Sequence, residues 1–311
     1  MTQDNTTVTE VSVSEAILED THLGHPMDTR TITRTIPTSV GNLAVHVTGS
    51  GPPTFLWHSL FVDSTTWAPL RSHLVAHRLL ISIDGPGHGA STAVQRRFTL
   101  QECAAAAVAV LDVLDVTEPV DWVGNAWGGH VGLVAAAHSP DRCRTVITIG
   151  TPTQALTRRE RARIVPMVWA YRLAGPVPPL TTAVMNVLLG KDLSRTHPQQ
   201  FQAVSRTFRQ SPQRGMHEAM QSVMLHREGL DPLLPRIGAP TLMIVPRADT
   251  MISLEQARAA AATMPHAAAT TVDGAGHVTP LIADPGTLAD VITEFWRDPG
   301  RTVITASADL P

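Results

Sequence analysis

The sequence predicts an α/β fold in which helices cover both faces of a mostly parallel sheet. Short apolar runs alternate with longer helical stretches along the chain, as is typical of buried parallel strands joined by crossover helices. This strand pattern stops over residues 153–235, where helices broken by proline and glycine replace it. A small-residue turn, Gly124 to Gly129, also stands between a strand and a helix. Together these observations predict one sheet-based domain with a helical insertion.

The first half of the chain supplies a hairpin and then buried strands. Residues 31–36 alternate as a half-buried strand should, and the turn signal Gly41-Asn42 leads into residues 43–47. Residues 53–58 are nearly all apolar, which predicts a central strand. A helix begins near Thr66, with proline in its first turn. We expect further strands at residues 78–83 and 120–124, an Ala-rich helix at 100–114 and a helix beginning at Val131.

The second half resumes the sheet after the helical stretch. Residues 145–149 predict the strand before the insertion, and residues 241–245 the strand after it. Residues 270–272 give a last short strand, and residues 288–296 a closing amphipathic helix. The expected organisation is an extension (1–28), a core (29–152 and 236–297), a helical cap or lid (153–235) and a tail (298–311).

Composition narrows the classes of function. The 311 residues are 43% hydrophobic and 16% charged, with a net charge of -3, so we expect no nucleic-acid partner and no membrane-surface partner. The first basic residue is Arg30 and no apolar run follows Met1, which predicts a cytoplasmic protein without a secretory signal. Cys103 and Cys143 should be reduced and buried. A short element at residues 11–18 could pack on a partner subunit, so the prediction includes a homodimer.

The turn at residues 124–129 has the frame of a nucleophile elbow, G-x-S-x-G, with Ala126 at its centre. In that motif the central residue is held in a strained conformation above the sheet, and glycines flank it because a Cβ would collide across the bend. The site is thus built for a nucleophile, yet the residue that would attack has no side-chain oxygen.

Five motifs in the correct order resemble the α/β-hydrolase fold family over roughly residues 30–297. They are His58-Ser59-Leu60-Phe61 at the oxyanion loop, Asp84-Gly85-Pro86-Gly87-His88-Gly89, the elbow, Pro246-Arg247-Ala248-Asp249, and Gly274-Ala275-Gly276-His277. The resemblance implies an α/β-hydrolase fold with an inserted cap and a triad in the order nucleophile, acid, histidine. His277 would be the base and Asp249 would orient it, while the backbone N–H groups of Leu60 and Trp127 would hold the oxyanion.

Other interpretations of these residues remain open. Asp249 could instead cap a helix beginning at Ser253, and His277 could be a surface loop histidine. His88 and His130 are expected to be structural, and His58 to shape the oxyanion loop through local hydrogen bonds. No dinucleotide fingerprint, P-loop or metal-ligand spacing is present, so no cofactor or metal is predicted.

The sequence departs from the family pattern twice. Ser59 replaces the usual glycine after His58, and Ala126 replaces the nucleophile. Ala126 could have been engineered to hold an unreacted substrate; a native alanine would instead indicate a binding protein, a pseudoenzyme, or His277 acting directly on water or substrate, as in a lyase or C–C hydrolase. The missing nucleophile is expected to be serine rather than aspartate, because Leu60 stands where dehalogenases carry a halide-binding asparagine.

The insertion is rich in apolar side chains and methionine, which adapts to ligands of varied shape. We therefore expect a small hydrophobic ester or lactone as substrate, although Arg206 and Arg209 leave room for an anionic one. The residues predicted to line the substrate pocket are His58, Ser59, Phe61, Trp169, Met185 and Met224.

Overall fold

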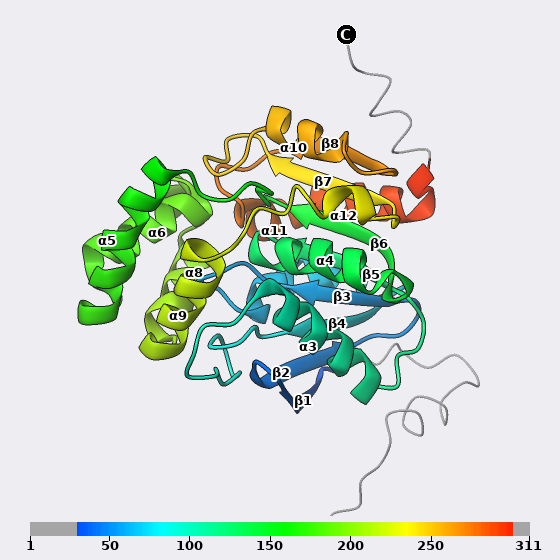
Figure 1. The fold of residues 1–311 in the computed structure, drawn as a ribbon, viewed down its shortest axis with the longest axis horizontal. Coiled ribbons are helices and arrows are strands. Elements are labelled where there is room, and N and C mark those ends of the chain that lie inside the picture. The colour runs from blue at the N-terminus through cyan, green and yellow to red at the C-terminus, as the bar shows by residue number, and fades with distance from the viewer. Residues whose placement is uncertain (1–29, 301–311) are drawn as a thin grey trace, which may run out of the picture.

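The computed structural model describes residues 30–300, and its centre is an eight-stranded sheet (Figure 1). The strands lie in the order β1-β2-β4-β3-β5-β6-β7-β8. The pairs β1–β2 and β2–β4 are antiparallel, and the other neighbouring strands are parallel. The predicted fold class is therefore confirmed. The element expected at residues 11–18 lies outside the described residues.

The eight strands fall where apolar runs or alternation predict them. They are β1 (Ile32–Thr38), β2 (Gly41–Thr48), β3 (Pro53–Trp57), β4 (Leu79–Ile83), β5 (Val120–Asn125), β6 (Cys143–Ile149), β7 (Thr241–Pro246) and β8 (Ala267–Val272). Every residue of β3, β5 and β7 is buried, because helices cover the central strands on both sides.

Outside the insertion, the helices pack on one another and on the sheet. The helix α3 (Leu100–Val113) packs on α4 (Trp127–His138), and α2 (Ala68–Leu74) packs on α11 (Thr279–Ala283) and α12 (Pro285–Arg297). The helix α10 (Leu254–Ala261) packs on β7 and β8. Short helical turns complete the core: η1 (Ser64–Trp67), η2 (Pro140–Arg142) and η4 (Leu234–Arg236). Cys103 and Cys143 are free and buried, as predicted.

The helix after the elbow begins earlier than the sequence predicts. It starts at Trp127 rather than Val131, so Gly128 and Gly129 belong to its first turn and not to a loop. A Cβ on Gly128 would lie 1.8 Å from the carbonyl oxygen of Trp57. Gly128 therefore lets the helix approach β3 closely, whereas a Cβ on Gly129 would lie 2.1 Å from Thr151 Oγ1, in the segment after β6. The small size of both residues reflects packing rather than turn formation.

The segment between β6 and β7 folds into helices that gather beside one end of the sheet (Figure 1). We call them the inserted helices: α5 (Arg158–Ala174), α6 (Pro178–Leu189), α7 (Leu193–Thr196), α8 (Pro198–Gln210), α9 (Gln213–Ala219) and the π-helix η3 (Met220–Leu225). Gly175 ends α5 and Gly190 ends α6, both at positive φ, as glycine after a helix commonly does.

Candidate active site

Parallel strands place the predicted triad positions at one edge of the sheet. Ala126 follows β5, Asp249 follows β7 and His277 follows β8, and the carboxyl ends of parallel strands open onto the same side. Gly150, directly after β6, lies between them: a Cβ there would be 2.3 Å from the His277 Cβ and 2.9 Å from Asp249 Oδ2. The absence of a side chain at Gly150 thus lets the acid and the base approach each other.

Ala126 has the backbone of a nucleophile elbow. Its φ is 46° and its ψ is -99°, a conformation that a residue with a Cβ adopts at a cost in free energy. Its N–H donates to the Ile149 carbonyl at 2.8 Å, and its carbonyl accepts from the His130 N–H at 3.0 Å. From Asp121 to Ala137, Ala126 is the residue that is not fully buried. The fold therefore holds a methyl group at the accessible point of a strained turn.

His277 and Asp249 form a buried pair. Nδ1 of His277 lies 3.9 Å from Oδ2 of Asp249, and neither atom has a hydrogen-bond partner in the part of the chain that the structure describes. Oδ1 of Asp249 accepts from the Met251 N–H at 2.8 Å. The alternative role for Asp249 does not hold, because the Ser253 side chain caps α10 itself in a capping box with Gln256. The surface-loop alternative for His277 is also wrong, since this residue is only 6% exposed.

Two further contacts hold the histidine loop in place. The Asn125 side chain donates from Nδ2 to the His277 carbonyl at 2.7 Å and to the Ile149 carbonyl at 3.0 Å. On the other side, the Val278 N–H donates to the Leu188 carbonyl at 3.0 Å and Thr279 Oγ1 to the Leu189 carbonyl at 3.1 Å. These carbonyls end α6, where the helix cannot satisfy them internally. An inserted helix thus positions the loop that carries His277.

Burial sets the protonation of the pair. Desolvation raises the pKa of Asp249 to about 6 and lowers the pKa of His277 to about 4. At pH 7 the carboxyl group is therefore ionised and the imidazole is neutral. This is the combination that a histidine base and its orienting carboxylate require.

Buried histidines shape the loop that the sequence predicts to bind the oxyanion. His58 Nε2 accepts from the Gly85 N–H at 2.7 Å, so its proton is on Nδ1, which donates to the Ser59 carbonyl at 2.6 Å. His88 Nε2 accepts from the Phe61 N–H at 3.4 Å, and Phe61 has a φ of 74°. Desolvation by burial lowers the pKa of His88 to about 3, so this ring is neutral as well. Both rings have the structural role that the sequence predicts.

The two predicted oxyanion donors lie on either side of the elbow. Trp127 is the first residue of α4, where backbone N–H groups point out of the helix and attract negative charge. Leu60 precedes Phe61 in the loop after β3. Within residues 30–300, the N–H groups of Leu60 and Trp127 donate no backbone hydrogen bond. Each is thus free to receive a ligand oxygen.

The predicted pocket residues are scattered. Ser59 and Met185 are each 1% exposed, and Met224 is half-buried on η3. Among the described residues, Ser59 Oγ has no hydrogen-bond partner. Trp169 is 52% exposed on the outer side of α5, with its ring 6.4 Å from that of His217. The prediction that Trp169 lines the pocket is therefore corrected, because the buried residues of α5 are Val168 and Tyr171.

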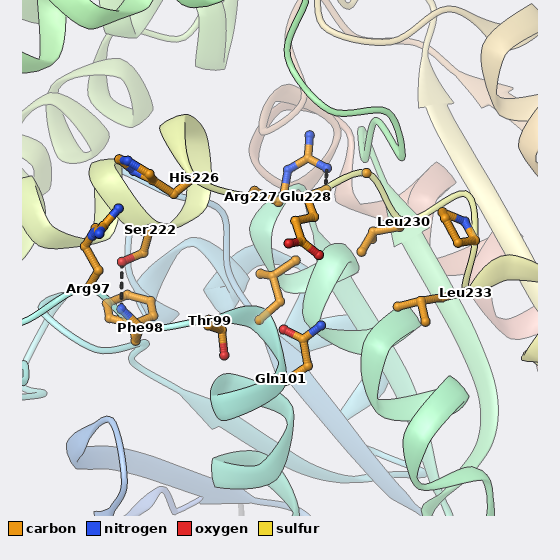
Figure 2. A pocket seen from close by; sticks show the side chains of 13 residues that line it. Arg97, Phe98, Thr99, Gln101, Ser222, His226, Arg227, Glu228, Leu230 and Leu233 are labelled. Atoms are coloured by element: carbon orange, nitrogen blue, oxygen red, sulfur yellow. Dashed lines mark hydrogen bonds between the residues drawn. The ribbon is translucent and has the colours of Figure 1, made fainter.

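A cavity of about 430 Å³ lies between the start of α3 and residues 222–233 (Figure 2). Its walls include Leu100, Leu230 and Phe98, whose N–H donates to Ser222 Oγ at 3.0 Å. None of the predicted pocket residues lines it. The Phe98 ring, which lines this cavity, lies 6.0 Å from the ring of Trp127.

In residues 30–300 no group of three His, Cys, Asp or Glu side chains is arranged to hold a metal ion. In the same part of the chain, no helix has the length and apolar character to cross a membrane.

Sequence reasoning missed Asn125, Gly150 and Thr279. Asn125 stands beside Ala126 in the elbow motif, which was the available signal. Nothing local connects Gly150 or Thr279 to the site, because their partners lie on other strands and helices.

The chain is similar in sequence and in structure to known hydrolases. A model of the alpha/beta hydrolase fold family matches residues 52–283. The pimeloyl-[acyl-carrier protein] methyl ester esterase of Xanthomonas oryzae is 27% identical over 274 residues, covering 81% of this chain and 97% of its own. A thermophilic esterase from Thermogutta terrifontis superposes with a TM-score of 0.78 at 24% identity, covering 87% of this chain and 99% of its own. The enol-lactonase of Burkholderia xenovorans gives 0.78 at 22% identity, covering 85% and 100%.

Proposed function

This chain belongs to the α/β-hydrolase fold family, and from that premise we propose that its site is built to cleave an apolar ester or lactone. The observation that carries the proposal is the strained backbone of Ala126 beside the buried pair of His277 and Asp249. Strain of this kind persists where the surroundings impose it for a function. The relatives compared above include an esterase and, at the level of fold, a lactonase.

The chemistry assigned to each residue follows from the geometry. With serine at position 126, Oγ would attack the carbonyl carbon while His277 accepts its proton, and Asp249 would stabilise the imidazolium. The N–H groups of Leu60 and Trp127 would bind the oxyanion, and His277 would then return the proton to the leaving alkoxide. Water would hydrolyse the acyl-enzyme by the same route. Ala126 cannot begin this sequence, so we infer that the chain binds substrate without forming an acyl-enzyme.

The proposed substrate is apolar because the surroundings are. Phe61 is buried within the proposed oxyanion loop, and its ring lies 5.4 Å from that of Phe208 from α8. Met185 is buried on α6. The inserted helices act in this proposal as a cap that encloses the acyl group.

The decisive experiment is Ala126→Ser, assayed on p-nitrophenyl esters of short and medium chain length and on lactones. We expect hydrolysis to rise about 10⁴-fold or more, because removing a triad member costs at least that much in serine hydrolases. Adding His277→Ala to the Ala126→Ser protein should abolish the gain. Hydrolysis by neither the parent nor Ala126→Ser contradicts the proposal.

A second candidate follows from the retention of the ionised Asp249 and neutral His277 without a nucleophile. In this candidate Ala126 is native, and His277 deprotonates water or the substrate itself, as in a lyase or C–C hydrolase. Slow turnover by the Ala126 protein, lost in His277→Ala, would support it. Sequencing the source gene tests the matching assumption, because a serine codon would make Ala126 an engineered residue.

A further inference from the structure

The outer face of α5 carries exposed apolar side chains in a basic surrounding. Trp169 is 52% exposed and Leu173 82%, and Val177, just beyond the end of the helix, is 36% exposed. Large apolar side chains that are exposed close together on one surface mark an interaction site. Figure 1 shows α5 at the outer margin of the inserted helices, on the side away from the sheet.

The helical repeat separates this face from the packed one. Val168 and Tyr171 are buried toward the other inserted helices, and Ile164 and Met167 are half-buried on the same side. The opposite stripe consists of exposed residues spaced three or four apart. These are Arg159, Arg163, Pro166, Trp169, Ala170 and Leu173. We call this stripe, extended by Val177, the α5 outer face. It has arginines at one end, apolar side chains at the other, and no carboxylate.

The charge of the chain is distributed unevenly. Residues 153–235 contain ten arginines and one lysine but five acidic residues, whereas the rest of the chain contains 13 basic and 22 acidic residues. The one acidic residue of α5, Glu160, is engaged at the helix start, where its carboxylate accepts from the Thr157 N–H at 2.8 Å. Arg158, Arg172 and, on α9, Arg214 are also exposed near the face. The overall net charge of -3 conceals this basic region.

We propose that the α5 outer face docks on the anionic surface of a lipid bilayer, with Trp169 and Leu173 entering the headgroup region and the arginines pairing with phosphates. Tryptophan and leucine combined with arginine suit a membrane interface, where an aromatic ring lies at headgroup level and each basic residue adds to binding. A second copy of the chain docked face to face would bring two basic surfaces together. This proposal replaces the expectation of no membrane contact, which rested on the net charge of the whole chain.

The docking also gives the proposed apolar substrate a source close to the inserted helices. Tyr171, on the inward side of α5, has its ring 5.7 Å from that of Phe208, which in turn contacts Phe61 beside the oxyanion loop. The docking test below does not use activity, so its failure leaves the hydrolase proposal standing.

Co-sedimentation with vesicles tests the proposal on the full chain. We expect binding to vesicles of phosphatidylcholine mixed equally with phosphatidylglycerol, at least tenfold weaker binding to phosphatidylcholine alone, and loss of binding at high salt. The double variant Trp169→Ser/Leu173→Ser should reduce binding at least tenfold, and so should Arg159→Glu/Arg163→Glu. The matched controls are Val113→Ser, which removes an apolar side chain that is 53% exposed on α3, and Arg258→Glu on the exposed side of α10.

Each other outcome overturns the proposal. Equal binding to both vesicle types, no binding to either, or equal losses in the controls would show that this face does not recognise anionic lipid. Sedimentation velocity distinguishes the alternative occupant: a dimer that Trp169→Ser/Leu173→Ser dissociates would assign the face to a second copy of the chain. Circular dichroism of each variant confirms that it is folded.

Discussion

Two carboxylates with inaccessible side chains, Asp121 and Asp249, lie near opposite ends of the strands of one sheet. The fold gives them different partners. Asp121 is the second residue of β5 and accepts from the Arg78 and Arg144 guanidiniums and from Thr145 Oγ1 at 2.6 Å. Asp249 accepts from the Met251 N–H, and its Oδ2 lies 3.9 Å from Nδ1 of His277 and has no hydrogen-bond partner among residues 30–300. The first carboxylate is fully compensated, whereas the second is left available.

The difference shows how one sheet separates stability from chemistry. Burying a charge costs free energy that only partners can offset, and the two guanidiniums do this for Asp121. Arg78 is itself held with its guanidinium carbon 3.9 Å from the centre of the Trp296 ring. At Asp249 the cost is not offset, and its pKa is raised to about 6 as a result. A group in that state gains most when a neighbouring imidazole becomes charged during reaction.

Removing the compensated charge should have the largest effect on stability. Asp121→Asn leaves two guanidiniums without their carboxylate, and we expect unfolding free energy to fall by about 3–5 kcal/mol. Urea denaturation of the parent and the variant measures it. A loss below about 1 kcal/mol would mean that solvent already screens the arginines, and that the two carboxylates are more alike than the comparison holds.

Removing the uncompensated charge of Asp249 should increase stability rather than reduce it. The folded pKa of Asp249, about 6, lies above its ordinary value of 3.8, so its ionisation costs stability as pH rises through that range. Asp249→Asn should therefore raise unfolding free energy by about 2–3 kcal/mol at pH 8 and change it little below pH 4. In the Ala126→Ser background the same change should lower kcat about 10⁴-fold. A variant that is destabilised at pH 8 would contradict this assignment.

The sequence predicts the strands and the site motifs better than it predicts contacts between distant residues. Apolar runs and alternation locate the strands, and motif order selects Asp249 and His277 as site candidates, because these signals are local in the chain. The contact of Asn125 with the His277 carbonyl spans 152 residues and depends on how strands pair. Asp121 was missed although it interrupts an apolar strand, which is itself a signal for a buried ion pair. Trp169 was misplaced because apolar character alone does not say which helix face points inward.

A side chain at position 150 should disturb the pair of Asp249 and His277 without affecting Asp121. Gly150→Ala would place a Cβ 2.3 Å from the His277 Cβ, at a φ of 59° that alanine adopts at a cost of about 1–2 kcal/mol. We expect a stability loss of that size, and a fall in the kcat of Ala126→Ser of about 10²-fold as His277 is displaced. Kinetics and thermal unfolding of the same preparation measure both. Unchanged turnover would show that the imidazole need not lie against Gly150.

The smallest effects come from one substitution, threonine to valine, made once beside Asp121 and once in the segment after His277. Thr145→Val removes a hydroxyl that donates to Asp121, and Thr279→Val removes one that donates to the Leu189 carbonyl at the end of α6. Both residues are buried, so each loss should cost about 1 kcal/mol of unfolding free energy. In the Ala126→Ser background, however, only Thr279→Val should lower kcat, because its hydrogen bond ties the His277 loop to the inserted helices. Equal turnover in the two variants would mean that α6 does not position the base, and Thr145→Val controls for the loss of stability itself.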